Sequence, residues 1–441
     1  MKVTTDNLIN KKKPQIGWTI IFAILLIGIS LWILSKPAGF SLADDPWKYL
    51  GQLTGILGTI LLSIEYLLST RAKFIEKIFG GLDRSYVAHR LIGGIGFVLI
   101  LYHPFFLSFD SSSLLSGLML HFLPGEVLSY NLGIFALYAY TALIFLTVYV
   151  RLPYNTWKKT HTFMGVPLVI AAYHILTIGS DMENYLPLEI FILTLVSIAI
   201  CSYLYKRFLY GRFSGQHKYK LEKINTLGEI VEINLKPVGA PMQFIAGQYV
   251  FIKFTSNEVA PELHPFSISS APGEPTIRIS IKKFGNFTKS LINLNENDNV
   301  TLYGPHGEFG TKSLESGKPE IWIAGGIGVT PFLSLLRYYS RQNSVKNITF
   351  FYCAKNTNDF TYKEEINSLA SHLGGMKVIF YESDKNGHIN GNKIEEMSDG
   401  LQGKKIFLCG PKGMMTSLVS EFESKKIHPH NIIFEDFSFL E

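Results

Sequence analysis

Two apolar stretches of helical length each carry two histidines at almost the same spacing. The first stretch is 85–106, with His89 and His103, and the second is 157–176, with His161 and His174. The spacings are 14 and 13 positions. A helix rises ~1.5 Å per residue, so each pair would span ~20 Å, most of the ~30 Å hydrocarbon core of a bilayer. We therefore expect four histidines at two matched depths within a membrane.

Ionisable side chains inside a membrane are costly and usually functional. Four histidines at matched depths on two helices predict two stacked haems, each iron bound by one imidazole from each helix. The alternative is that each histidine only hydrogen-bonds to a neighbouring helix. Successive residues are ~100° apart on a helix, so 14 steps return to nearly the same face but 13 do not. The second helix is thus expected to kink, overwind or tilt, and Pro167 is a candidate kink.

The 441-residue chain has a positive mean hydropathy, yet 17% of its residues are charged. This mixture predicts a membrane domain joined to a soluble part. Six apolar segments are candidate spans: Ile16–Leu34, Leu50–Ser69, Ala88–Phe106, Leu132–Val150, His161–Ile178 and Ile190–Tyr205. The first is expected to be a retained helix rather than a cleaved signal peptide, whose apolar part is usually only ~7–15 residues long.

Positive charge is unevenly distributed among the loops that connect these segments. Lys and Arg occur between segments two and three, between four and five, and after six, but not between three and four or five and six. The positive-inside rule then predicts six spans with both termini in the cytoplasm. Segments three and five run in the same direction. This pairs His89 with His161 near the cytoplasmic side and His103 with His174 near the outer side.

Composition excludes several classes of protein. The net charge is +6, but the chain has no arginine-rich arm or nucleic-acid motif, so no nucleic-acid partner is expected. Its three cysteines are Cys201, Cys353 and Cys409, and none has CxxC spacing. We therefore expect no disulfide framework, zinc site or iron–sulfur cluster, and any haem should be b-type because no CxxCH motif is present.

The second half of the chain is patterned like two soluble domains. Residues 218–310 alternate as short strands, at 219–224, 229–235, 248–254, 265–270, 276–284 and 299–304, which predicts a small antiparallel barrel. From Glu320, strand and helix patterns alternate, with strands at 321–324, 347–354, 377–382, 404–411 and 431–437. That alternation predicts a parallel nucleotide-binding sheet. The expected domains are 1–213, 217–312 and 318–441.

Four motifs lie in these two domains. AGGIGVTP (324–331) joins a strand to a helix, where glycines permit a tight turn and helix N–H groups can hold a pyrophosphate. CGPKGMM (409–415) repeats the layout after a later strand. HPFSIS (264–269) and KFGNFT (283–288) combine aromatic and hydroxyl side chains that suit a flat ring. The alternatives are simple strand-end turns and core aromatics.

HPFSIS, GxxT, GGIGVTPF and CGPKGMM, in that order, resemble the ferredoxin–NADP reductase superfamily. With six apolar segments and paired histidines before them, the chain is similar to NADPH oxidases and ferric reductases. It is closest to short bacterial NADPH oxidases without calcium-binding extensions. The resemblance covers the chain from about Trp18 onward. It implies a six-helix membrane bundle followed by a β-barrel FAD domain and an α/β nicotinamide-nucleotide domain.

The resemblance implies an FAD site on the barrel domain. Phe266 and Ser267 would contact the isoalloxazine, and His264, where soluble relatives often have arginine, would lie near it with Pro265. Gly285 and Thr288 would hold the FAD pyrophosphate.

The resemblance also implies a nicotinamide-nucleotide site, formed by Gly325, Gly326, Gly328, Thr330 and Pro331 together with Gly410 and Pro411. Cys409 would lie near the nicotinamide. Lys355 would contact the 2′-phosphate of NADPH; it keeps the charge of the usual arginine but lacks its two-pronged fork, so NADH stays an alternative. Phe437 would cover the flavin face that nicotinamide must reach, and Phe439 is the alternative stacking residue.

The implied activity is that of an NAD(P)H oxidase or ferric reductase-type oxidoreductase. Electrons from cytosolic NADPH would pass through FAD and two b-type haems to an acceptor outside the cell membrane of a bacterium. The expected acceptor is O2, giving superoxide. A ferric or cupric reductase and a haem conduit to a partner protein are the alternatives, but a conduit would not need its own nicotinamide motifs. Apart from the lipid bilayer, no obligatory partner is expected.

Overall fold

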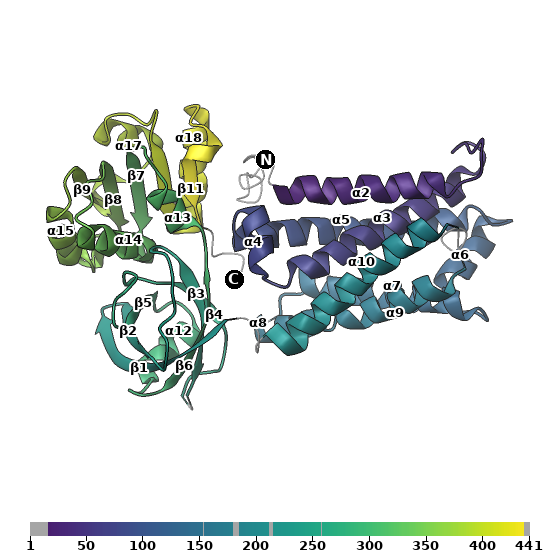
Figure 1. Ribbon diagram of the computed structural model, residues 1–441, viewed down its shortest axis with the longest axis horizontal. Helices are drawn as coiled ribbons and strands as arrows, with labels where there is room; N and C mark the ends of the chain where they lie inside the picture. The colour runs from purple at the N-terminus through teal and green to yellow at the C-terminus, as the bar shows by residue number, and fades with distance from the viewer. Residues whose placement is uncertain (1–15, 153, 180–184, 211–214, 257, 436–441) are drawn as a thin grey trace. The chain divides into compact units, whose positions relative to one another are not determined.

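The computed structural model describes residues 16–152, 154–179, 185–210, 215–256 and 258–435. These residues divide into two compact units, one made of the described residues within 14–211 and the other of those within 212–440 (Figure 1). The first unit is helical, and the second contains two β-sheets.

Five helices in the described residues are long and apolar enough to cross a membrane. They are α2 (Ile16–Leu34), α3 (Pro46–Leu68), α5 (Leu82–Ser108), α7 (Leu128–Val148) and α10 (Leu186–Leu204), the last continued by the π-helical turn Tyr205–Leu209. Many of their large apolar side chains are exposed, for example Phe22, Ile95 and Phe135. Exposed apolar side chains on apolar helices suit contact with lipid. These helices correspond to five of the six predicted segments.

The predicted segment His161–Ile178 is not one continuous helix. It is divided between α8 (Tyr154–Thr162) and α9 (Gly165–Thr177), so His161 and His174 lie on different helices. The break precedes Pro167 by a few residues; proline lacks the N–H for a bond to the preceding turn and therefore fits only near a helix start. The expected irregularity between the two histidines is thus a break before Pro167 rather than a kink at it.

Two further short helices complete this unit. Helix α4 (Lys73–Phe79) ends at Gly80, which has a left-handed conformation. Helix α6 (Leu114–Phe122) lies in a stretch that the sequence analysis left as a loop. The side chains of Ser113 and Ser116 form a reciprocal cap at its N-terminus, a local arrangement that starts a helix.

The first sheet has six antiparallel strands in the order β4-β3-β6-β1-β2-β5. The strands are β1 (Gln216–Leu227), β2 (Ile230–Pro237), β3 (Tyr249–Thr255), β4 (His264–Ser267), β5 (Ile277–Lys282) and β6 (Asn299–His306). All six match predicted strands. The edge strands approach each other beyond β4, where Ile268 and Ile279 form an isolated bridge. Closure into a complete barrel stays a prediction.

The second sheet has five parallel strands in the order β11-β10-β7-β8-β9. The strands are β7 (Glu320–Gly325), β8 (Ile348–Ala354), β9 (Met376–Glu382), β10 (Lys405–Cys409) and β11 (Ile432–Phe434). Helices between them include α14 (Thr330–Arg341), α15 (Lys363–Ser371), α17 (Gly391–Met397) and α18 (Lys412–Ser424). Trp322, Phe332, Phe350 and Phe407 are completely buried in its core. The predicted strand–helix alternation is confirmed.

The chain order of these strands changes direction beside β7. From β7 it proceeds to β8 and β9 on one side, and then returns to β10 and β11 on the other. In such sheets, ligands bind beyond the carboxyl ends of the strands at the point where the order reverses. The fold therefore predicts a ligand site at the loops that follow β7 and β10.

Candidate functional sites

His89 on α5 and His161 on α8 lie close together in the helical unit. Their ring centroids are 6.2 Å apart, and the ring of His161 also stacks on Trp157 with a centroid distance of 5.2 Å. The break between α8 and α9 lets His161 face His89 independently of the direction of α9.

His103 on α5 and His174 on α9 line one cavity of about 630 Å³. Glycines of two other helices lie against their rings. A Cβ atom at Gly55 would be 2.6 Å from the ring of His103, and one at Gly133 would be 2.9 Å from the ring of His174. Both positions therefore need glycine if the imidazoles are to keep these places.

Backbone carbonyls determine which ring nitrogen is available in three of the four histidines. Nδ1 of His89 lies 3.1 Å from the backbone carbonyl oxygen of Glu65. Nδ1 of His103 and Nδ1 of His174 each lie 2.7 Å from a backbone carbonyl oxygen, that of Gly51 and that of Ser129 respectively. A carbonyl only accepts hydrogen bonds, so Nδ1 carries the proton and Nε2 keeps a free lone pair. Metal-bound histidines commonly have this arrangement, so these three residues would hold a metal ion through Nε2.

Nδ1 of His161 is buried and has no hydrogen-bond partner within the described residues. A ligand histidine usually donates this proton to a neighbouring group. His161 therefore fits the ligand role by its place beside His89, without the backbone bond that orients the other three rings.

Glu65 on α3 is a neighbour of His89 that the sequence analysis missed. Its Oε1 atom lies 3.5 Å from Nε2 of His89, while its backbone oxygen lies near Nδ1 of the same ring. An acidic residue inside an apolar segment is itself a functional signal, because a carboxylate is costly there. That signal was available in Leu50–Ser69 and could have identified Glu65.

The predicted flavin residues of the first sheet lie together on β4. His264, Pro265, Phe266 and Ser267 are consecutive and pair with β3. His264 stacks on Phe287 with a centroid distance of 3.9 Å. Nε2 of His264 is 2.8 Å from a carboxylate oxygen of Glu262. His264 is thus engaged with an acidic side chain and an aromatic ring, and Phe266 remains partly exposed beside it.

Gly285 and Thr288 form the turn that starts the short helix α12 (Asn286–Ser290). The backbone N–H groups of Phe284 and Gly285 donate to Oγ1 of Thr288, at 2.8 and 2.9 Å. The hydroxyl therefore shapes the turn. A Cβ atom at Gly285 would have no described atom within 4 Å, so the backbone there is open to an approaching group.

The two glycine motifs of the second sheet meet where the strand order reverses. β7 and β10 are neighbours, with Ala324 opposite Cys409. A Cβ atom at Gly328 would be 2.3 Å from the Cys409 carbonyl oxygen, and one at Gly410 would be 3.0 Å from the Gly325 backbone. Gly326 has a φ of +54°, a left-handed conformation that glycine adopts readily. Gly325, Gly326, Gly328, Cys409, Gly410 and Pro411 are therefore brought into one place.

Two helices begin at this place. Thr330 and Pro331 open α14, and Lys412 opens α18 directly after Pro411. Helix N-termini present free N–H groups and the positive end of the helix dipole, which favours a phosphate. The arrangement can hold the pyrophosphate of a dinucleotide.

Lys355 follows β8 and is exposed at the carboxyl end of the sheet. β8 is the neighbour of β7, so Lys355 lies one strand away from the glycine loop. Phe437 and Phe439, the predicted stacking aromatics, lie outside the described residues.

Three parts of the chain match known families. Residues 54–172 match the ferric reductase like transmembrane component, residues 215–330 an FAD-binding domain, and residues 322–420 the oxidoreductase NAD-binding domain.

Similar proteins include flavohemoprotein A of Dictyostelium discoideum, 28% identical over 49% of this chain and 58% of that protein. The flavohemoprotein of Bordetella pertussis is 27% identical over 52% of this chain and 62% of its own length. The chain thus spans about three fifths of the length of these relatives. A flavohemoglobin structure from Malassezia yamatoensis is similar with a TM-score of 0.50, at 18% identity, over 90% of this chain and 97% of that one, a likeness of fold alone.

The three family matches follow one another in the order of the sites described above: membrane component, FAD-binding domain and NAD-binding domain. Together, the ferric reductase like transmembrane component and the FAD- and NAD-binding domains of this chain match a ferric reductase-like/NADPH oxidase family.

Proposed function

We propose that this protein moves electrons from cytosolic NADPH, through FAD and two b-type haems, to an acceptor on the other side of the membrane. O2 is the proposed acceptor, with superoxide as the product. The observation that carries the proposal is the pairing of the histidines: His89 lies beside His161, and His103 shares a cavity with His174. One pair at each depth is the arrangement that two stacked haems need.

The four histidines would hold the haems through Nε2. In His89, His103 and His174 the backbone bond at Nδ1 presents Nε2 as the metal-binding nitrogen. The predicted segment His161–Ile178 is divided between α8 and α9, and this break would let His161 and His174 be oriented separately as haem ligands.

On the soluble side, FAD would supply the exchange between two-electron hydride transfer and one-electron transfer. Phe266 and Ser267 would bind its ring system, and the turn at Gly285 and Thr288 its phosphates. The glycine loops and the starts of α14 and α18 would bind the nicotinamide nucleotide. These residues position the two ring systems, and hydride transfer between them needs no acid or base from the protein.

The direction of transfer rests on the distribution of charge along the sequence. Lys and Arg recur in the loops that would face the cytoplasm and are absent between segments three and four and between five and six, which would give both termini a cytoplasmic location. The protein would thus reside in a cell membrane and deliver electrons outward. An NAD-binding domain at residues 322–420 supports an enzyme with its own electron source over a conduit that depends on a partner.

Reduction of ferric complexes is the second candidate, favoured by the match of residues 54–172 to a ferric reductase like component. One assay separates the two activities. Purified protein loaded with haem and FAD is given NADPH alone, and superoxide is measured by a dismutase-sensitive probe; a parallel sample receives a ferric chelate without oxygen. Superoxide formation without an added metal supports the oxidase. Turnover that requires the ferric chelate, with no superoxide in air, overturns the oxidase proposal in favour of the reductase.

A further inference from the structure

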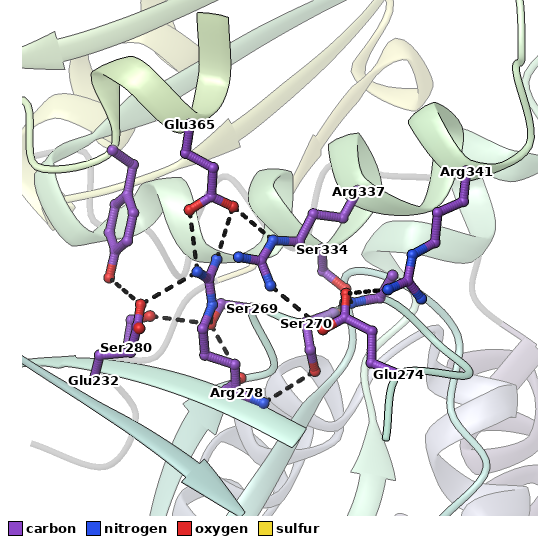
Figure 2. A network of polar contacts seen from close by, with 12 residues as sticks. Glu232, Ser269, Ser270, Glu274, Arg278, Ser280, Ser334, Arg337, Arg341 and Glu365 are labelled. Atoms are coloured by element: carbon purple, nitrogen blue, oxygen red, sulfur yellow. Dashed lines mark hydrogen bonds and ion pairs between the residues drawn. The ribbon is translucent and has the colours of Figure 1, made fainter. Parts of the chain in front are cut away.

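A partly buried ion pair links the first sheet to a helix that follows the second strand of the parallel sheet. Arg278 on β5 and Glu365 on α15 are linked by two parallel hydrogen bonds, each of 3.1 Å (Figure 2). The Arg278 side chain is 9% exposed and also lies 3.3 Å from the carboxylate of Glu232 on β2. Tyr362, which precedes α15, donates to the same Glu232 carboxylate and lies beneath the guanidinium.

Helix α14 extends this contact along the boundary. Nε of Arg337 donates to Glu365 at 2.6 Å, and its Nη1 lies 3.5 Å from Glu274 of the first sheet domain. Arg341, one turn later, lies 3.3 Å from the other oxygen of Glu274. Glu365 therefore binds one arginine from each domain, Arg278 and Arg337 (Figure 2). Glu274, from the first sheet domain, binds two arginines of α14 (Figure 2).

The same contacts reach the segment that continues from the predicted flavin strand. Ser269 and Ser270 follow Ser267 by two and three positions. Oγ of Ser269 accepts from Nε of Arg278 at 3.2 Å, and Oγ of Ser270 accepts from the Arg278 backbone N–H at 3.1 Å. Ser334 on α14 donates to the Ser270 carbonyl oxygen at 2.6 Å.

In the domain of the parallel sheet, α14 begins at Thr330, at the end of the glycine loop that is predicted to bind the nucleotide. Ser334 and Arg337 belong to its first turns. A path of contacts therefore leads from the flavin strand at Ser267 to Ser270, across the hydrogen bond to Ser334, and along about one turn of α14 to the nucleotide loop. We name the residues that form this connection the domain-bridging network: Glu232, Ser269, Ser270, Glu274, Arg278, Ser334, Arg337, Arg341, Tyr362 and Glu365.

We infer that the domain-bridging network is a positioning device for hydride transfer, which holds the nucleotide loop at a set distance and angle from the flavin strand. The inference rests on the proposed function, in which a nicotinamide reduces the flavin. Hydride transfer needs reacting atoms ~3–3.5 Å apart, and a misplacement of ~1 Å costs about a hundredfold in rate. The two-pronged arginine–carboxylate contact defines direction as well as distance.

An ordinary structural role is the competing explanation, and it has a different consequence. A buried ion pair often contributes little net stability compared with apolar packing, although removing one partner leaves an uncompensated charge. Loss of a purely structural contact would lower the melting temperature without slowing hydride transfer in the molecules that remain folded. Loss of a positioning contact would slow hydride transfer while nucleotide and FAD remain bound.

The test uses the full-length, FAD-loaded protein and two conservative variants. Arg278→Lys keeps the charge but loses the two-pronged contact, and Glu365→Gln keeps the shape but loses the charge. Anaerobic stopped-flow mixing with saturating NADPH measures flavin reduction. We expect the limiting rate to fall about tenfold or more, with weaker nicotinamide–flavin charge-transfer absorbance, while the nucleotide dissociation constant and FAD content change less than about twofold.

Glu395→Gln is the matched control. Glu395 on α17 pairs with Lys425 at 2.6 Å, a contact made entirely within the nucleotide domain. Its loss should leave the limiting rate of flavin reduction unchanged. If Arg278→Lys or Glu365→Gln fails to retain FAD, Ser334→Ala and Glu274→Gln are measured instead, since they remove only the links between α14 and the flavin side.

The outcomes separate this inference from the proposed function. If the wild-type flavin is not reduced by NADPH or NADH, the proposed function fails. If the wild type is reduced and the network variants that retain FAD share its limiting rate, the network is an ordinary structural contact and the inference is wrong. A slower limiting rate with intact binding, absent in Glu395→Gln, supports it.

Discussion

Arg278 and Glu365 face each other across the domain boundary with two hydrogen bonds of equal length, 3.1 Å each. Glu365 also accepts a bond of 2.6 Å from Arg337. Burial by itself raises the pKa of Glu365, but the hydrogen bonds and charges of the two arginines lower it by more, so its pKa lies below the ordinary value. The carboxylate is therefore bound in its ionised form.

This lowered pKa predicts a loss of stability in acid. The folded state binds the Glu365 proton less readily than the unfolded state, so the stabilisation is complete above the unfolded pKa and disappears as the pH falls through the folded pKa. The melting temperature of wild type should exceed that of Glu365→Gln at about pH 6–7, and the gap should narrow towards about pH 3. FAD release on heating, followed by flavin fluorescence, provides the measurement. A gap that is constant or widens in acid would contradict the prediction.

Haem content tests the histidine pairing. A pyridine haemochrome assay should find two haems per wild-type chain and one in each single variant His89→Ala, His103→Ala, His161→Ala or His174→Ala. Double variants define the pairs: His89→Ala with His161→Ala should keep one haem, whereas His89→Ala with His174→Ala should keep none, because each iron loses a ligand.

The control for this assay is His121→Ala, since His121 lines the same cavity as His103 and His174 without being a predicted ligand. It should keep both haems. One haem in the wild type, or the opposite result in the two double variants, would show that the pairing is wrong.

Lys355 tests the choice of nucleotide. Removal of a partly desolvated contact with the 2′-phosphate should cost ~1–3 kcal/mol. Lys355→Ala should therefore raise the KM for NADPH roughly tenfold or more and leave the KM for NADH nearly unchanged. Lys318→Ala is a control, because Lys318 precedes β7 at the opposite end of the sheet. Equal losses with both nucleotides would remove Lys355 from the 2′-phosphate site.

Gly328 tests the contact between the two loops of the nucleotide site. In Gly328→Ala the new Cβ would lie 2.3 Å from the Cys409 carbonyl oxygen, a backbone atom, so one of the loops must move. Overpacking of this kind costs about 1–3 kcal/mol. We expect a lower melting temperature and flavin reduction slowed roughly tenfold or more.

In Gly317→Ala the added Cβ has no described atom within 4 Å, so this variant is the control. It should match the wild type in both melting temperature and rate. If Gly328→Ala also matches the wild type, the two loops are not in the close contact that the site requires.

Much of the architecture follows from local sequence patterns. Period-two alternation identified all six strands of the first sheet, and strand–helix alternation identified the five strands of the second. The glycine motifs predicted the two turns that meet beside β7 and β10. These features are local, because periodicity and backbone freedom act within a few residues. The sequence also indicated the pairing of His89 with His161, since charge in the loops orders the helices.

Contacts between distant residues were decided only by the tertiary structure. The 13-residue spacing of His161 and His174 called for an irregular helix, but only packing separated it into α8 and α9. Glu65 reaches His89 because α3 packs along α5, and no pattern in either helix encodes that approach. Arg278 and Glu365 occupy ordinary positions in a strand and a helix. Their pairing arises because folding removes much of both side chains from water, and a charge removed from water needs an opposite partner.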